Sequence, residues 1–248
     1  MTITKRVLWV KLAGVVLLAG QFLVAGDFDP ASLDSGSFLQ LARRPFLQHA
    51  WARLDGTVQF KNDHRNVKLP LHLAILMHSD YLRAEFTLDH SDLYEVRQAY
   101  SDQGVSNVRI TPPPQPQAPP LESLGVAAED ITFSFLYWEF VEELPGRTVR
   151  GQKCRVMRLR NPQTHAEVVV SLSAQYVGPM RVEHFKAGET QAYRWMEFTD
   201  FERHGDLYYV TAAQLRGKNW KTQVKFNNAE LALTEETAPP EDLFAAGR

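Results

Sequence analysis

The single cysteine of the chain, Cys154, lies between Lys153 and Arg155. Neighbouring cations lower the pKa of a thiol, and the thiolate that results is a nucleophile. A catalytic cysteine also needs a base, and the surrounding run "RGQKCRVMRL" contains no histidine. Free cysteine is among the most often buried residue types and packs as a small hydrophobe. We therefore interpret Cys154 as a packing residue of a strand.

Eight histidines raise the question of a metal site. His72 and His78 share one face of an expected strand, but at the strand rise per residue they lie about 20 Å apart. No pair has the spacing of a zinc or iron motif. The Gly-x-Ser-x-Gly elbow and the phosphate-binding glycine loop are also missing from the sequence. The sequence therefore predicts no metal, no cofactor and no enzymatic activity, and a net charge of -2 gives no reason to expect nucleic acid as a partner.

The N-terminus has the layout of a secretory signal. Lys5, Arg6 and Lys11 precede an apolar run from Leu12 to Val24, which small residues follow up to Gly26. This order is typical of a signal peptide over residues 1–26, cleaved near Gly26, and it predicts a periplasmic protein. The alternative is an uncleaved anchor in the inner membrane, although Gly20 and Gln21 shorten the apolar run below the length of a bilayer span.

Alternating apolar residues indicate the strands that must position any site. An amphipathic helix is expected over residues 29–51, and a second helical pattern covers residues 121–138. Between them the period-two pattern predicts strands at 51–60, 66–78, 81–89 and 92–100. After the second helix it predicts strands at 152–159, 167–173, 180–186, 193–204, 207–216 and 220–226. The proline-rich residues 111–120 are expected to form an extended surface loop, because proline cannot donate to a sheet.

The order helix, strand meander, helix, strand meander predicts a mainly β (α+β) chain. About ten long antiparallel strands indicate a single strongly curved sheet that forms an incomplete β-barrel, with the two helices covering its concave side. Residues 27–232 form the expected domain. The last residues, 233–248, lack periodicity and are expected to be a mobile tail.

Three stretches carry a resemblance to a known family. "EDITFSFLYW", "VRGQKCRVMRLRNP" and "MRVEHF" together resemble the outer-membrane lipoprotein-sorting protein family, which is similar to the lipoprotein carriers LolA and LolB. The resemblance covers roughly Leu39 to Phe226 in the order of elements. It implies an incomplete barrel whose helices plug the concave side and enclose a cavity for acyl chains. It also implies that Cys154 belongs to a core strand.

The candidate lipid-contacting residues are the apolar rows expected to face inward: Val58, Phe60, Leu69, Leu71, Leu73, Ile75, Met77, Leu82, Phe86, Leu88, Phe135 and Trp138. A solid protein core needs the same residue types, so that interpretation stays open. The predicted function is a monomeric periplasmic carrier that moves lipid or lipoprotein acyl chains towards the outer membrane, served by a delivery partner in the inner or outer membrane. The alternatives are a non-catalytic scaffold of the cell envelope that docks partners on its curved sheet and a hydrolase of envelope lipids.

Overall fold

A computed structural model describes residues 29–43, 49–99, 107–204 and 207–244. The predicted signal peptide, residues 1–26, lies outside these ranges, as do residues 44–48 of the first predicted helix. That helix is shorter than predicted: a 3₁₀ turn, η1 (Pro30–Ser32), precedes α1 (Ser35–Arg43), and a strand already begins at Ala50.

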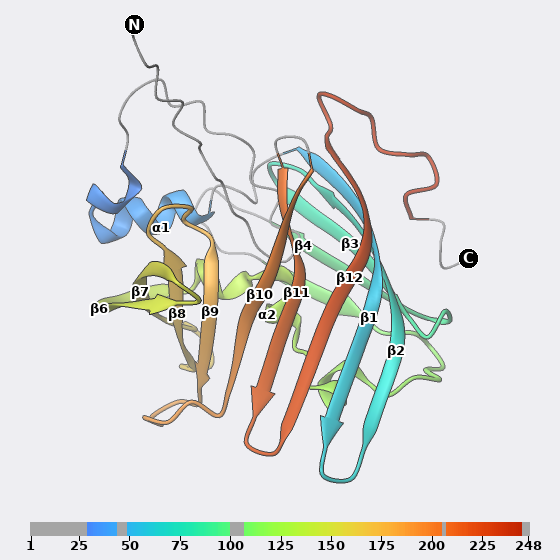
Figure 1. Cartoon of the computed structure of the whole chain (residues 1–248), viewed down its shortest axis with the longest axis horizontal. Helices are drawn as coiled ribbons and strands as arrows, with labels where there is room; N and C mark the ends of the chain where they lie inside the picture. The colour runs from blue at the N-terminus through green and yellow to red at the C-terminus, as the bar shows by residue number, and fades with distance from the viewer. Residues whose placement is uncertain (1–28, 44–48, 100–106, 205–206, 245–248) are drawn as a thin grey trace, which may run out of the picture.

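One antiparallel sheet of twelve strands makes up most of the described chain (Figure 1). The first meander comprises β1 (Ala50–Asn62), β2 (Asn66–Met77), β3 (Tyr81–Leu88), β4 (Asp92–Ala99) and β5 (Asn107–Thr111). The second comprises β6 (Glu139–Val149), β7 (Gln152–Arg160), β8 (Glu167–Ser173), β9 (Pro179–Phe185), β10 (Arg194–His204), β11 (Leu207–Gly217) and β12 (Trp220–Leu233). Pairing of β1 with β12 joins the two meanders, so β5 and β6 are the free edges. The mainly β class and the single antiparallel sheet are confirmed.

The sequence pattern predicted about ten strands and did not predict the two edge strands, β5 and β6. The stretch of β6, "EFVEELPGRTV", alternates poorly because most of its side chains are exposed, and its pairing with β7 shifts register twice. Glu142 and Glu143 belong to this strand. An edge strand also tolerates Pro145, whose nitrogen donates no ladder hydrogen bond. Edge strands lack the covered face that produces a clear period of two.

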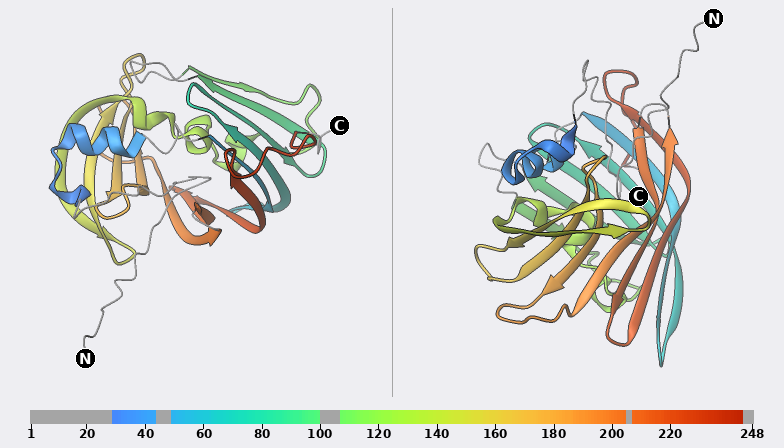
Figure 2. Two further views of the ribbon diagram at one scale, coloured as in Figure 1. Left: turned by 90° about the horizontal axis from the view of Figure 1, so that it is seen from above. Right: turned by 60° about the vertical axis from the view of Figure 1, so that its left-hand side comes forward.

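The connection between the two edges crosses one face of the sheet. It contains η3 (Leu121–Leu124), α2 (Ala128–Thr132) and η4 (Ser134–Tyr137), in place of the single predicted helix over residues 121–138. Gly125 ends η3 and Phe133 ends α2, each with a positive φ (74° and 50°) that turns the chain out of the helix. These helices and α1 lie on the same side of the sheet (Figure 2). We call this side the inner face.

Two apolar cores fill the inner face. The first packs residues of β1–β4, β11 and β12 against Leu121 and Leu124 of η3. The second packs β7–β11 against α1 and η4, including the fully buried Phe133 and Phe135. Arg43 at the end of α1 donates hydrogen bonds to the carbonyls of Leu136 (2.7 Å) and Trp138 (3.2 Å), which fixes α1 to η4. Val126 and Val224 contact both cores and so mark the seam between them.

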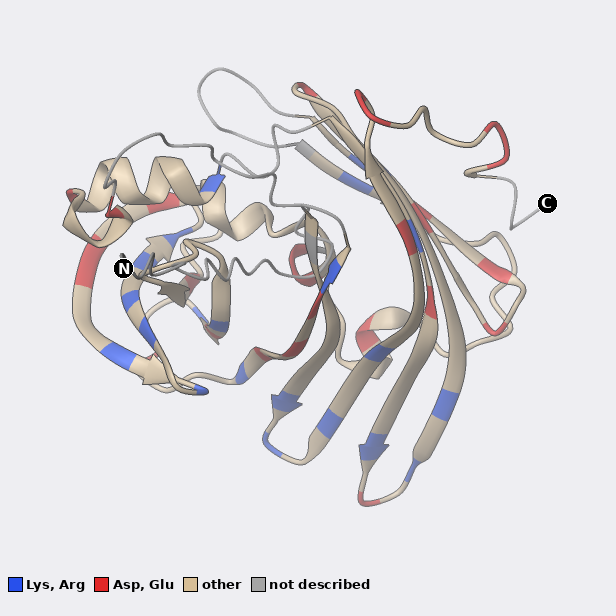
Figure 3. Cartoon of the chain, turned by 45° about the horizontal axis from the view of Figure 1, so that its top comes forward, with Lys and Arg blue, Asp and Glu red and all other residues tan. Residues whose placement is uncertain are grey.

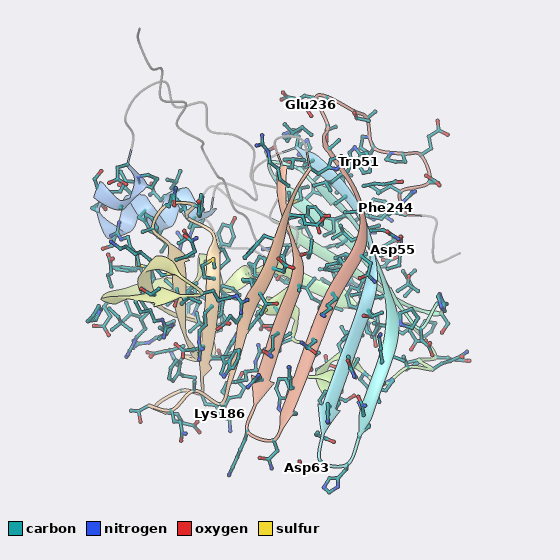
Figure 4. All side chains as sticks on the ribbon, viewed as in Figure 1. Trp51, Asp55, Asp63, Lys186, Glu236 and Phe244 are labelled. Carbon is teal, nitrogen blue, oxygen red and sulfur yellow. The ribbon has the colours of Figure 1, made fainter. Side chains whose placement is uncertain are left out.

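The residues after β12 lie against the outer face. Trp51 Nε1 donates to the carbonyl of Thr237 (2.9 Å), and Leu243 is buried with Trp51. Arg83 lies over the ring of Phe244, 3.9 Å from its centroid. Figure 4 labels Trp51 and Phe244 near this segment. Among the described residues, none of the helices has both the length and the apolarity needed to cross a bilayer.

Candidate ligand-binding cavity

A cavity of about 80 Å³ lies at the seam between the two cores. Its walls combine residues of the first core, residues of the second, and Val126 and Val224, which contact both. The lining consists of Val58, Leu71, Leu73, Ile75, Phe86, Leu88, Leu121, Val126, Asp130, Ile131, Met196, Ala213, Leu215, Val224 and Phe226. All of these except Asp130 are apolar, so the cavity suits a hydrocarbon group.

The sheet side of the cavity follows from the alternation of side chains along each strand. Leu71, Leu73 and Ile75 occupy every second position of β2 and therefore point to one face. In the register of the sheet, Leu73 lies opposite Phe86 of β3 and Leu71 lies opposite Leu88. Across the β1–β12 junction, Val58 pairs with Val224. The two meanders thus bring their inward rows together although they are far apart in sequence.

The roof of the cavity comes from the edge-to-edge connection. Leu121 of η3, Val126 and Ile131 of α2 face the sheet. The Asp130 carboxylate accepts from the backbone N–H of Ala127 (2.8 Å) and so caps the start of α2. Arg194 of β10 donates to the same carboxylate oxygen at 2.6 Å. The roof is therefore attached to the sheet by a charged contact.

Asp130 belongs to a buried polar cluster with Arg194 and His184. The Asp130 and Arg194 side chains are 3% and 8% exposed, so their charges are paired away from water. Burial lowers the pKa of His184 well below its ordinary value, and the Arg194 charge lowers it further, so this imidazole is neutral. Its Nδ1 lies 3.4 Å from an Arg194 nitrogen. The remaining nitrogen, Nε2, lies 3.6 Å from Asp130 Oδ1, which is longer than a normal hydrogen bond.

One end of the first core is closed by Trp220, the first residue of β12. Its ring contacts Gly125 and Gly217 so closely that a Cβ at either glycine would lie within 2.5 Å of ring atoms. Phe60 stacks on Trp220 with 6.3 Å between ring centroids. Thr222, buried two residues later, donates its hydroxyl to the carbonyl of Leu124. Hairpin β11–β12 and η3 are therefore tightly joined beside the cavity.

The structure separates the predicted lipid-contacting residues into two groups. Val58, Leu71, Leu73, Ile75, Phe86 and Leu88 line the cavity. Phe60, Leu69, Met77 and Leu82 pack in or against the first core away from it, and Phe135 and Trp138 pack with the second core. Whether any of them contacts lipid stays a prediction.

Sequence reasoning missed nine of the fifteen lining residues, those that come from β10–β12 and the roof. The alternation in "LYYVTAAQLR" and "WKTQVKF" carried a signal, because it sets Ala213 with Leu215 and Val224 with Phe226 on one face. This alternation could not reveal that β1 pairs with β12, the pairing that places those rows beside Val58. Asp130 gave no signal as a lining residue, since its position depends on the roof.

Cys154 lies outside this site. It is 4% exposed and packs with Val149 and Met180. Burial raises the pKa of its thiol, despite the weaker opposing effect of the Arg147 charge. The interpretation of Cys154 as a packing residue is confirmed.

Comparison with solved structures finds similar folds. A domain described provisionally as an outer membrane lipoprotein-sorting protein, from Vibrio parahaemolyticus, matches with a TM-score of 0.62 and 14% identity over 85% of this chain and 97% of that one. A DUF1329 family protein from Desulfovibrio piger matches with 0.63 and 11% over 88% and 98%. A LolA superfamily protein from Nitrosomonas europaea matches with 0.51 and 10% over 85% and 99%. No family model and no curated protein matches the sequence.

Proposed function

We propose that this protein is a carrier of acyl chains in the cell envelope, without a catalytic step. The observation that carries the proposal is the apolar cavity at the seam between the two cores, covered by the short helices η3 and α2 and not by a strand. The similar folds of the lipoprotein-sorting domain and the LolA superfamily protein support it. In this proposal residues 1–26 direct export, and the monomer works in the periplasm as an incomplete barrel that takes lipid or lipoprotein towards the outer membrane.

The size of the cavity sets a condition on the mechanism. Pockets for drug-sized ligands are about 300–1,000 Å³, well above the cavity volume of about 80 Å³. A full acyl chain therefore enters only when the roof, with Val126 and Ile131, moves away from the sheet. Each buried CH₂ contributes about 0.8 kcal/mol. Opening the roof costs free energy, which offsets part of the binding energy of the acyl chain. The acyl chain therefore binds tightly enough to stay shielded from water yet weakly enough to be released.

Cavity variants test the proposal with a fatty acid that carries an environment-sensitive fluorophore. Leu73→Glu places a charge in the apolar lining, and Ala213→Leu fills the space with carbon. We expect both to lose most of the fluorescence increase that the unchanged protein gives. Ala213→Leu should keep or raise the unfolding free energy, because it fills a void.

The matched control is Ala212→Leu, the same change one residue earlier on the opposite face, where Ala212 pairs with Lys225. It should leave uptake unchanged. Full uptake by folded Ala213→Leu would count against the carrier.

A scaffold of the envelope is the second candidate, and the solid packing favours it. Large side chains such as Leu54, Met77, Phe135 and Phe198 are fully buried, so most of the inner face is filled. A scaffold has no need of acyl uptake. Absence of a fluorescence increase in the unchanged protein, at probe concentrations that a carrier binds, would favour it.

A further inference from the structure

Five cations gather on the outer face at one end of the sheet, on four adjacent strands. They are Lys61 of β1, Lys68 of β2, Arg216 of β11, and Lys221 and Lys225 of β12; we call them the basic patch. Their neighbours along each strand, such as Phe60, Leu215 and Thr222, are buried on the inner face, so the five point outward. Figure 3 shows the corresponding blue bands at the turn ends of these strands.

The register of the sheet places the basic patch in three successive rows. The rows are Arg216–Lys221–Lys61–Asn66, Gln214–Gln223–Gln59–Lys68, and Ala212–Lys225–Thr57–Pro70. On these four strands the rows hold five cations and no carboxylate; on the next strand, β10, the second and third rows continue to Glu197 and Asp200. Among the residues that the structure describes, none of the five forms an ion pair; Arg216 contacts Gln214 (3.2 Å) and the ring of Trp195 (5.3 Å to its centroid). The adjoining turns hold Asp63, which Figure 4 labels at this end, and Lys218; Arg65 is directed to the inner face, where it lies over the ring of Phe60.

Folding alone does not explain this arrangement. Lys221 lies directly opposite Lys61 on one side and directly opposite Arg216 on the other. Like charges in directly opposed positions destabilise a sheet. The whole chain carries a net charge of -2, so the basic patch does not follow from an excess of basic residues. Acidic residues instead gather towards the other end, where Glu230 lies in the far half of β12 and Glu235, Glu236, Glu241 and Asp242 follow that strand (Figure 3).

We propose that the basic patch is a docking surface for the anionic headgroups of a lipid bilayer. The side chains between the cations are neutral and mostly polar, with Ala212 and Pro70 as the small apolar exceptions. Among the described residues, the large exposed apolar side chains, Tyr81, Phe140, Val141 and Tyr193, all lie outside the three rows. Protein interfaces are centred on an apolar core, which this surface lacks. A layer of anionic headgroups needs only matched charge. The inference does not depend on acyl uptake by the cavity.

Such a surface would hold the protein with one end of its strands against the membrane. Cations attract an anionic leaflet only within about a Debye length, roughly 8 Å at physiological salt. The five cations lie in three rows at neighbouring positions of the same strands. All of them can therefore come within that distance of the headgroups at the same time. Binding would therefore be reversible and sensitive to salt.

Co-sedimentation with vesicles tests the proposal. The unchanged full chain should bind vesicles of phosphatidylglycerol mixed with phosphatidylcholine more strongly than vesicles of phosphatidylcholine alone, and the difference should disappear at high salt. Lys61→Gln with Lys221→Gln should weaken binding to the anionic vesicles about thirtyfold, from the typical contribution of each cation near such a surface. The same double variant should unfold at a higher urea concentration, because it removes the opposed charges.

The matched control removes two cations elsewhere. Arg109→Gln with Lys153→Gln changes the net charge equally at exposed positions of β5 and β7 and should keep anionic binding. The apolar N-terminal segment is common to every variant and both vesicle types, so it does not produce a difference between them. The proposal is overturned if the Lys61/Lys221 variant binds as the unchanged protein does, or if both double variants lose binding equally. It is also overturned if a soluble acidic peptide binds the patch as tightly as the vesicles do.

Discussion

At the scale of single residues, the polar cluster under the roof shows how burial controls charge. Asp130 and Arg194 are paired, and His184 contacts Arg194 from the neighbouring strand β9. Breaking such a buried pair by removing one partner typically destabilises a protein by about 3–5 kcal/mol, because it leaves an uncompensated charge. That cost comes from the charge left unpaired and is not the net stability that the pair adds. The main effect of the pair is to fix the position of α2.

His184 gives the protein a pH dependence of known sign. Its pKa is lowered in the folded state by burial, whereas in the unfolded chain it lies near 6.5. Below about pH 6.5 the unfolded chain therefore binds a proton that the folded protein does not, and the unfolding free energy falls as the pH falls. The loss reaches up to about 1.4 kcal/mol per pH unit until the folded pKa is reached. Urea unfolding between pH 5 and 8 measures it.

The variant His184→Gln should flatten this part of the curve, since it removes the titrating group. His64→Gln, at an exposed turn position, provides the control and should keep the slope of the unchanged protein. An identical slope in all three proteins would exclude His184 as the source.

At the scale of elements, the strands that could be predicted from the sequence are those whose side chains alternate regularly between buried and exposed. Edge strands and strands with a bulge lack this regular alternation and could not be predicted fully. The segment predicted at 66–78 is β2 at Asn66–Met77, because its apolar row is unbroken. The last strand was predicted to end at residue 226 but continues to Leu233. Its register shifts where Gly56 pairs with Phe226 while Asp55 pairs with Asn228. A bulge of this kind moves the inward row by one residue, and the period of two is lost.

Gly56 is the residue that this bulge requires. A Cβ at position 56 would lie 2.0 Å from the backbone carbonyl oxygen of Lys225, which cannot rotate away as a side chain would. We expect Gly56→Ala to lower the unfolding free energy by about 3 kcal/mol, the upper end of typical overpacking costs. Denaturant titration measures the change. Gly146→Ala, whose Cβ would lie 3.1 Å from its nearest backbone neighbour, should cost much less; equal losses in the two variants would contradict the steric explanation.

At the scale of the whole molecule, the sheet was predictable but the place of the cavity was not. Val58 and Leu73 were expected to face inward, and they do. Their partners Ala213 and Val224 come from the second meander, and no local pattern in the sequence reveals that β1 pairs with β12. The roof depends on a path from one sheet edge to the other, which becomes visible only once β5 and β6 are known to be the edges.

This architecture predicts an uneven stability across the molecule. The strands β1 and β12 each pair on both sides and form the junction of the two meanders. The connection above them makes backbone hydrogen bonds mainly among its own residues, for example from the N–H of Val126 to the carbonyl of Leu121. It is held to the sheet by side chains, such as Thr222 to Leu124 and Arg194 to Asp130. Segments held in this way open at a lower free energy than a central strand.

Native-state hydrogen exchange followed by mass spectrometry measures this difference. We expect peptides covering residues 121–132 to exchange through local opening, at denaturant concentrations that leave the amides of β1 and β12 protected. The Arg194→Met variant should accelerate exchange in the same peptides more than in β1, because it releases α2 from the sheet. If residues 121–132 exchange only when the whole sheet unfolds, the roof cannot open separately. In that case a cavity of about 80 Å³ would be too small to admit an acyl chain.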